Sequence, residues 1–257
     1  MNDAKWFAEI WRDPETGEKL EWRGNSLLRP DGKTYPVHDG IVSIVHPAEL
    51  GGEDAKMNRF YNLMTPLYDF LERSGGSLLA GMDMVKGRAE IVERLNLQPG
   101  MKLLEVSPGP GVFQRMLRER VGPDGVIISL DLSLAMLRQC RTKNSDLNIH
   151  LVHGNGQALP FAAGTFDAVF HFGGVNLFND PAEAIREFCR VTGPGGIVAW
   201  GDEGFSSHYA HHFRRKLLTK INPGFQKPRP LVPPELNRVS EYEVYDGLAY
   251  LAVGEKS

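Results

Sequence analysis

The chain has 257 residues, of which 42% are hydrophobic and 24% charged, and its formal net charge is −3. This composition is typical of a globular protein, and no apolar stretch approaches the roughly 20 residues that a membrane span needs. The polar start lacks a signal-peptide pattern, so we expect a cytoplasmic protein. Its mild acidity argues against a nucleic-acid partner, whereas composition leaves a homodimer open. Both cysteines, Cys140 and Cys189, are expected to be free thiols.

Residues 1–46 contain short apolar runs separated by turn residues such as Asp13–Gly17 and Pro30–Gly32. Turn residues at this spacing separate short strands, so we predict a small β module over 1–46. The glycines that follow, within 47–56, favour a linker.

Apolar residues then recur at helix-like intervals over 60–71, and a second helix is expected over 78–95. Together with the linker they form a predicted second segment, 47–99. Aromatic residues at helical spacing usually belong to a core, yet Tyr61 and Tyr68 are also candidates for substrate contact.

The rest of the chain, 100–257, alternates between apolar runs and helical patterns. Alternation at this period predicts an α/β protein with a doubly wound parallel sheet. The expected strands lie near 102–106, 126–131, 149–153, 167–171 and 196–201, and the expected helices near 111–120, 133–143 and 181–191. The tail is different, because strand-like runs flank Asp246-Gly247, a pair that favours a hairpin turn.

The most informative stretch is Leu103–Phe113, where an apolar run ends in an acid and a glycine-bearing turn. Gly109 and Gly111 have no side chain that would hold a ligand away from the backbone. The next apolar run ends in Asp131, a position from which a carboxylate can bind the ribose hydroxyls of an adenosine ligand. We interpret this unit as a nucleotide-binding strand, loop and helix.

The loop alone does not identify the cofactor, since dinucleotide dehydrogenases share its outline. Their third glycine would fall at Gln114, whereas Glu105–Gly111 is one substitution away from the Glu-x-Gly-x-Gly-x-Gly of class I S-adenosylmethionine (SAM) dependent methyltransferases. Further segments resemble this family, and in particular its ubiquinone and menaquinone C-methyltransferases. They are Asp131–Leu137, Gly154–Phe161, Phe166–Val169 and Glu187–Gly196.

The resemblance implies a Rossmann-like, seven-stranded sheet with a terminal antiparallel hairpin and SAM as cofactor. It implies that Glu105 takes the methionine ammonium or orients the loop, that Asp131 holds the ribose, and that Asn155 replaces the usual adenine-binding aspartate. Ser107 replaces the first glycine and would be strained at positive φ. The remaining predicted cofactor contacts are Gly109, Gly111, Leu132, Gly156 and Phe172. Phe161 fits an adenine wall or the core equally well.

Substrate is expected at the carboxyl ends of the strands, where open α/β sheets bind ligands. His171, Asp202 and His208 are candidates for a general base, and Asn176 and Glu203 for substrate contact. For His171, a place in the core is the competing interpretation. The proline-rich, basic segment 206–236 is expected to be a lid that matches an acidic substrate.

The N-terminal segment Tyr35–Ile41 resembles the zinc ribbon of a methyltransferase-activator subunit, but no cysteine precedes Cys140. A thiolate zinc site cannot form there, so we expect no metal. The leading hypothesis is a methyltransferase that acts on O, C or N of a small aromatic or anionic metabolite. An rRNA or tRNA methyltransferase and a non-catalytic binding protein of the same fold remain as alternatives.

Overall fold

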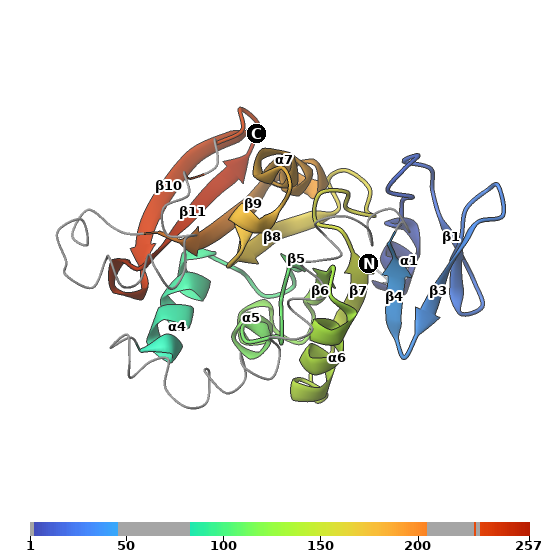
Figure 1. The fold of residues 1–257 in the computed structure, drawn as a ribbon, viewed down its shortest axis with the longest axis horizontal. Coiled ribbons are helices and arrows are strands. Elements are labelled where there is room, and N and C mark those ends of the chain that lie inside the picture. Colours follow the sequence, from blue (N-terminus) through green and yellow to red (C-terminus); the bar gives the residue numbers. More distant parts are fainter. Residues whose placement is uncertain (1–2, 46–82, 205–228, 230–231) are drawn as a thin grey trace.

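The structure is a computed structural model that describes residues 3–45, 83–204, 229 and 232–257 (Figure 1). Its helices are α1 (Asp3–Glu9), α4 (Met84–Arg94), α5 (Gln114–Val121), α6 (Leu134–Lys143) and α7 (Pro181–Val191). Its strands are β1 (Glu21–Arg23), β2 (Ser26–Leu28), β3 (Thr34–His38), β4 (Ile41–Ile44), β5 (Lys102–Val106), β6 (Val126–Asp131), β7 (His150–Gly154), β8 (Phe166–Phe172), β9 (Thr192–Glu203), β10 (Leu236–Val244) and β11 (Ala249–Lys256). Two short 3-10 turns, η1 (Val175–Leu177) and η4 (Tyr245–Gly247), follow β8 and β10.

All the described strands belong to one sheet with the order β1-β2-β3-β4-β7-β6-β5-β8-β9-β11-β10. The five central strands, from β7 to β9, are parallel, which confirms the predicted α/β class. The predicted count of seven strands is not confirmed, because the sheet formed by the described residues has eleven. Four N-terminal strands extend the edge beyond β7, and the sequence offered no way to see that they would pair there.

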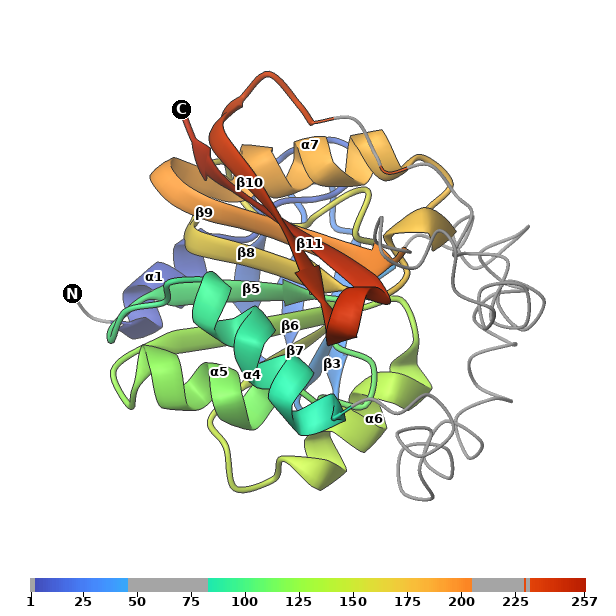
Figure 2. The ribbon, with the colours of Figure 1, turned by 90° about the vertical axis from the view of Figure 1, so that its left-hand side faces the viewer.

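The sheet lies between two helical layers, with α7 on one face and α4, α5 and α6 on the other (Figure 2). Neighbouring residues of a strand point to opposite faces. Leu104 accordingly belongs to the core that includes Phe188 of α7, and Leu103 to the core that includes Leu117 of α5. Burial on both faces explains why the central strands read as continuous apolar runs.

The predicted C-terminal hairpin is present, since β10 and β11 are antiparallel and β11 also pairs antiparallel with β9. Its loop has four residues, Tyr245 to Leu248, because Val244 is the register partner of Ala249. Ala249 in turn lies opposite Glu203, so the loop is placed at the carboxyl end of β9. The hairpin therefore brings a turn to the edge of the sheet where ligands are expected.

The N-terminal segment is continuous with the central sheet. Neighbouring strands from β1 to β4 pair antiparallel, but β4 runs parallel to β7 (Figure 1). Trp11 is fully buried and forms a β-bridge with Phe161, so this segment also shares a core with the rest. The division into segments 1–46, 47–99 and 100–257 stays a prediction, as does the zinc-ribbon resemblance.

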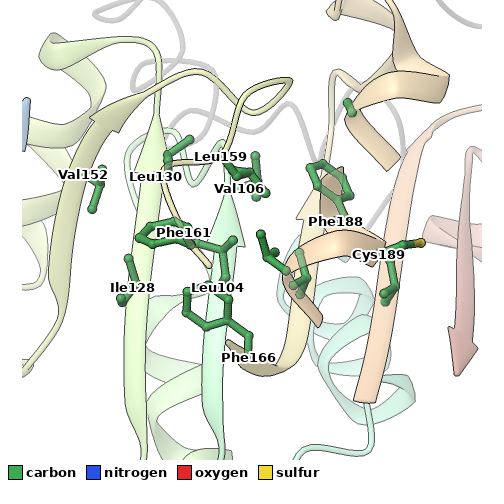
Figure 3. Close-up of a cluster of buried hydrophobic side chains, with 14 of the residues drawn as sticks. Leu104, Val106, Ile128, Leu130, Val152, Leu159, Phe161, Phe166, Phe188 and Cys189 are labelled. Carbon is green, nitrogen blue, oxygen red and sulfur yellow. The ribbon is translucent and has the colours of Figure 1, made fainter. Parts of the chain in front are cut away.

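Figure 3 shows the core between the sheet and α7, with Phe161 and Phe166 lying against the side chains of β5 and β6. Phe161 is fully buried, and its ring centroid lies 5.3 Å from Trp11 and 5.1 Å from Phe166. It is therefore a core residue and not an adenine wall. Cys140 and Cys189 are buried free thiols, as expected.

Several predicted features lie outside the described residues: Tyr61, Tyr68, His208, the helix over 60–71 and nearly all of the lid segment 206–236. The second predicted helix, over 78–95, is described as α4. None of the helices in the described ranges combines the length and apolarity that a membrane crossing requires.

Candidate functional site

The strand order changes direction between β5 and β8, since the chain moves outward to β6 and β7 and then returns to β8 and β9. Open α/β sheets bind ligands in the crevice at this switch point, at the carboxyl ends of the strands. Val106 of β5 and His171 of β8 are register partners there. The glycine-bearing loop after β5 thus begins at the switch point.

The loop from Ser107 to Gly111 has a left-handed backbone at three positions, with φ of 57° at Ser107, 55° at Gly109 and 80° at Gly111. The expected strain at Ser107 is thus present, because residues with a Cβ adopt this region at a cost. The neighbouring strands hold the turn in place. The Ser107 N–H donates to the Leu130 carbonyl at 2.7 Å, and the Val106 carbonyl lies 3.0 Å from His171 Nδ1.

The two glycines serve different purposes. A Cβ at Gly109 would meet nothing within 4 Å, so this position gives a ligand open access to the backbone. A Cβ at Gly111 would lie 2.5 Å from Cys140 Sγ and 2.6 Å from Asn144 Nδ2. Asn144 Nδ2 also donates to the Gly111 carbonyl at 3.2 Å. Gly111 is therefore required for packing of the loop on the end of α6.

Asp131 ends β6 beside this loop and is 8% exposed. Its Oδ1 accepts from the Ser133 N–H at 2.8 Å, and its Oδ2 accepts from the Gly109 N–H at 3.1 Å. Burial raises the pKa of Asp131 to about 6, although both hydrogen bonds lower it. The Asp131 carboxylate at the end of β6 is thus hydrogen-bonded to the loop after β5. A single adenosine site shared by these two segments would require this arrangement.

Glu105 lies beneath the loop and is 2% exposed. Its Oε2 accepts from Gln114 Nε2, and Gln114 Nε2 also lies 2.7 Å from Ser129 Oγ. Burial raises the pKa of Glu105 to about 8, and the nearby Asp131 charge adds to this effect. These contacts support the predicted role in orienting the loop, whereas contact with a methionine ammonium stays a prediction.

Asn155 and Gly156 follow β7 at the same edge. Asn155 Oδ1 accepts from the Gln157 N–H at 2.9 Å and closes a local turn. A Cβ at Gly156 would lie 2.9 Å from both Phe178 and Val106, so the chain passes too close to these side chains for a larger residue. Their predicted contacts with adenine, and that of the half-buried Leu132, stay predictions.

The structure places His171 and Asp202 in supporting positions. His171 is fully buried and packs against Phe178 and Phe188, whose ring centroids lie 5.3 and 5.9 Å away. Burial lowers the pKa of His171. Asp202 is 1% exposed and accepts backbone N–H groups from Gly174 and Asn176, each at 2.9 Å. It therefore holds the loop that follows β8.

Phe172 and Glu203 end strands β8 and β9 at this edge. The Phe172 ring packs between Phe113 and Tyr245, whose ring centroids lie 5.9 and 5.7 Å away. Glu203 and Asn176 are half-buried. Phe172, Asn176 and Glu203 thus come together at one edge with the glycine-bearing loop, although their contacts with cofactor or substrate stay predictions.

Several supporting residues were not predicted as site residues. Arg190 donates to the carbonyls of Leu159 and Phe161 at 2.9 and 2.7 Å, and Glu187 Oε2 accepts the Leu159 N–H at 2.8 Å. This pair fastens the segment after β7 to α7. Ser129, Gln114 and Asn144 were missed too, although a polar residue inside an apolar strand or on an apolar helix face is a signal of such a role.

Comparisons with known proteins agree with this geometry. A family model described as a methyltransferase domain matches residues 104–200. Demethylmenaquinone methyltransferase from Geobacillus stearothermophilus is 31% identical over 171 residues, which cover 63% of this chain and 71% of that protein. The chain belongs to the SAM-dependent methyltransferase family. The protein of the same name from Listeria welshimeri is 33% identical over 57% of this chain, and the chain spans 62% of that relative's length.

Solved methyltransferase structures share the fold. A SAM dependent methyltransferase from Aquifex aeolicus superposes with a TM-score of 0.51 at 19% identity, covering 71% of this chain and 94% of that one. Geranyl diphosphate C-methyltransferase from Streptomyces coelicolor, solved with S-adenosyl-L-homocysteine, gives a TM-score of 0.52 at 16% identity, covering 67% and 76%. The chain thus has a fold like that of these solved methyltransferases.

The residues present fit the family cofactor, SAM. Gly109 leaves open space at the loop, and the Asp131 carboxylate can accept from the two ribose hydroxyls. The solved methyltransferase from Aquifex aeolicus is described as SAM dependent, and the one from Streptomyces coelicolor was solved with S-adenosyl-L-homocysteine. In the described ranges, no three His, Cys, Asp or Glu side chains are grouped as a metal site.

Proposed function

We propose that this protein is a SAM-dependent methyltransferase that transfers a methyl group to O, C or N of a small aromatic or anionic molecule. The observation that carries the proposal is the hydrogen bond between Asp131 Oδ2 and the Gly109 N–H. This bond joins Asp131, the acid proposed to bind the ribose, to Gly109, whose backbone is open to a ligand, at the switch point of the sheet. Family membership supplies the donor, and the names of the relatives favour an aromatic acceptor.

When bound, SAM supplies a sulfonium methyl group that is already activated for transfer. The main task of the chain is therefore to hold the two reactants in line, which can lower the barrier by about 7–11 kcal/mol. Asp131 would hold the ribose, Gly109 would give the ligand access to the backbone, and Glu105 would support the loop from below. The acceptor approaches past Phe172, Asn176 and Glu203.

The predicted base roles of His171, Asp202 and His208 stay part of the proposal. The contacts of His171 and Asp202 favour a positioning role, because His171 bonds the Val106 carbonyl and both oxygens of Asp202 accept backbone N–H groups. His208 lies outside the described residues. An acceptor that ionises readily needs no dedicated base.

Calorimetric titration with SAM, S-adenosylhomocysteine and NAD, in parallel, tests the proposal. We expect micromolar binding of both adenosyl compounds and none of NAD. Absence of adenosyl binding would overturn the proposal and favour a binding protein of the same fold. Transfer of labelled methyl from SAM to a small-molecule extract, set against bulk rRNA and tRNA, then tests the acceptor class. Labelled RNA with a steep salt dependence would identify the rRNA or tRNA alternative.

A further inference from the structure

His153 lies on β7 between the N-terminal strand β4 and the ribose-binding end of β6. Its register partners are Ser43 of β4 on one side and Asp131 of β6 on the other. The imidazole is 7% exposed. A buried histidine at this place connects the first segment of the chain with the residues that are proposed to bind the cofactor.

Both ring nitrogens of His153 have partners. Nδ1 lies 3.0 Å from Ser43 Oγ, and Nε2 lies 3.1 Å from the Leu132 carbonyl oxygen. A carbonyl can only accept, so Nε2 carries the proton and donates it. In the neutral ring, Nδ1 then accepts from the Ser43 hydroxyl. Burial lowers the pKa of His153, which keeps the ring neutral near pH 7.

The acceptor of this bond is next to the ribose-binding acid in the chain. Leu132 follows Asp131 directly, and the N–H of Ser133 donates to Asp131 Oδ1 at 2.8 Å. The Leu132 carbonyl and the Asp131 carboxylate are therefore part of the same short turn, and the conformation of this turn sets the orientation of both groups. A ring that holds this carbonyl also limits how far the turn can rotate.

We propose that Ser43 and His153 are positioning residues of the cofactor site, so that strand β4 of the N-terminal segment takes part in cofactor binding. Ser43 fixes the ring of His153, and His153 fixes the turn that carries Asp131. This inference rests on the proposed function and adds to it a role for the N-terminal strands. The backbone pairing of β4 with β7 does not depend on either side chain.

Two substitutions of His153 distinguish its hydrogen bond to the Leu132 carbonyl from its hydrogen bond to the Ser43 hydroxyl. The side-chain amide of glutamine can occupy the place of Nε2, so His153→Gln keeps a donor for Leu132. The amide of asparagine is closer to the place of Nδ1, so His153→Asn keeps only the contact with Ser43. Ser43→Ala removes the hydroxyl alone. His150→Asn is the matched control, because His150 lies on the same strand, half-buried against Phe7 at 4.5 Å, at the end remote from the site.

The readouts are the dissociation constant of S-adenosylhomocysteine by calorimetry and the melting temperature of each variant. We expect affinity to fall about tenfold in His153→Asn and about threefold in Ser43→Ala. His153→Gln and His150→Asn should stay within twofold of the parent chain. Equal affinities for His153→Asn and His153→Gln, or losses that only follow the melting temperatures, would overturn the inference.

Nitrogen-15 NMR of the imidazole gives a readout that needs no ligand. The parent chain should show His153 as the tautomer with the proton on Nε2. Ser43→Ala should keep this tautomer, because the Leu132 carbonyl still accepts from Nε2, and should shift the Nδ1 resonance, which loses the Ser43 hydroxyl. A proton on Nδ1 in the parent chain would overturn the inference. If the parent chain binds no S-adenosylhomocysteine, the proposed function fails and this inference with it. If the parent binds and the variants bind equally, only the inference fails.

Discussion

Ser107 has a left-handed backbone conformation that is unfavourable for a residue with a Cβ atom. With φ at 57°, it adopts a region that glycine enters freely and other residues enter at a cost of about 1–2 kcal/mol. The strain persists because the bonds from Ser107 N–H to Leu130 and from His171 to Val106 determine the turn from both sides. Strained residues held in this way are frequent at ligand sites.

Ser107→Gly should therefore stabilise the protein. We expect the free energy of unfolding in urea to rise by about 0.5–1 kcal/mol. The relief of backbone strain at positive φ should exceed the entropic cost of ordering a glycine, which is more flexible in the unfolded chain. Gly109→Ala, at φ 55°, should lower it by about 1 kcal/mol. A destabilised Ser107→Gly would show that the serine hydroxyl makes a contribution larger than the strain.

Asp131 is the residue on which the proposed cofactor site depends. Asp131→Ala removes the acceptor for the ribose hydroxyls, so SAM affinity should fall more than tenfold, about 1.4 kcal/mol or more, while circular dichroism stays unchanged. Asp146→Ala is the control, since Asp146 is an exposed carboxylate paired with Arg115 at 3.0 Å. Unchanged affinity in Asp131→Ala would refute the assignment.

The ionisation of Asp131 should appear in the pH dependence of binding. Its pKa is raised to about 6, so the carboxylate predominates at pH 7.5 and the acid at pH 5. Because hydroxyl donors prefer the charged acceptor, SAM affinity should fall about tenfold over this range. Calorimetry at several pH values measures this, and a flat profile between pH 5 and 7 would contradict it.

At the scale of elements, Glu105, Gln114 and Ser129 connect β5, α5 and β6 beneath the loop. Glu105 and Ser129 lie within apolar strands and Gln114 begins a helix, and the three buried side chains form hydrogen bonds with one another. A buried network of this kind is costly to break in part, because the remaining partners lose their hydrogen bonds without gaining water. The position of the loop after β5 therefore depends on how β5, α5 and β6 pack together.

The raised pKa of Glu105 gives this network a signature in the stability of the protein. The folded chain holds a proton on Glu105 up to about pH 8, whereas the unfolded chain releases it near pH 4.5. The resulting stability is complete below pH 4.5 and is lost as pH rises through 8. Between pH 6 and 8 the free energy of unfolding should fall on the order of 1–3 kcal/mol.

Urea titrations of the parent chain and of Glu105→Gln at pH 6, 7 and 8 test this expectation. The variant cannot titrate at this position, so its stability should change less over the range. Asp131 has the same sign of effect, but its pKa of about 6 places most of its contribution below this window. Parallel curves for both chains would mean that Glu105 is ionised throughout.

At the scale of the whole molecule, the N-terminal segment and the methyltransferase sheet share strands and core. β4 pairs with β7, and Trp11 is buried against Phe161 with no exposed surface. Elements that share a core in this way are expected to unfold together. The predicted β module over 1–46 therefore packs on the methyltransferase sheet, while its division from the rest of the chain stays a prediction.

Trp11→Ala should therefore destabilise the whole chain by about 3–5 kcal/mol, the usual cost of removing a buried aromatic side chain. We expect a single calorimetric transition in the parent chain and in the variant, at a lower temperature in the variant. Val85→Ala, at a position that is 63% exposed, is the control and should not shift the transition. Two resolved transitions in the parent chain would show independent units.

Local sequence patterns were enough to predict the class of fold, the glycine-bearing loop after β5 and the acid proposed to bind the ribose. Apolar runs ending at Glu105 and Asp131, with Gly109 between them, are local patterns, and local patterns determine which strands are buried on both faces and where turns fall. The family resemblance followed from the same segments. The predictions of the cofactor and of the enzyme class therefore needed no tertiary information.

Which side chains become partners in hydrogen bonds and in the core became known from the three-dimensional contacts alone. That β4 pairs with β7, that His153 connects Ser43 to Leu132, and that Phe161 belongs to the core all depend on contacts between residues far apart in the chain. No local pattern specifies such partners, because a buried polar group needs a partner but its own sequence neighbourhood does not say which one. Long-range pairing of strands supplies that choice.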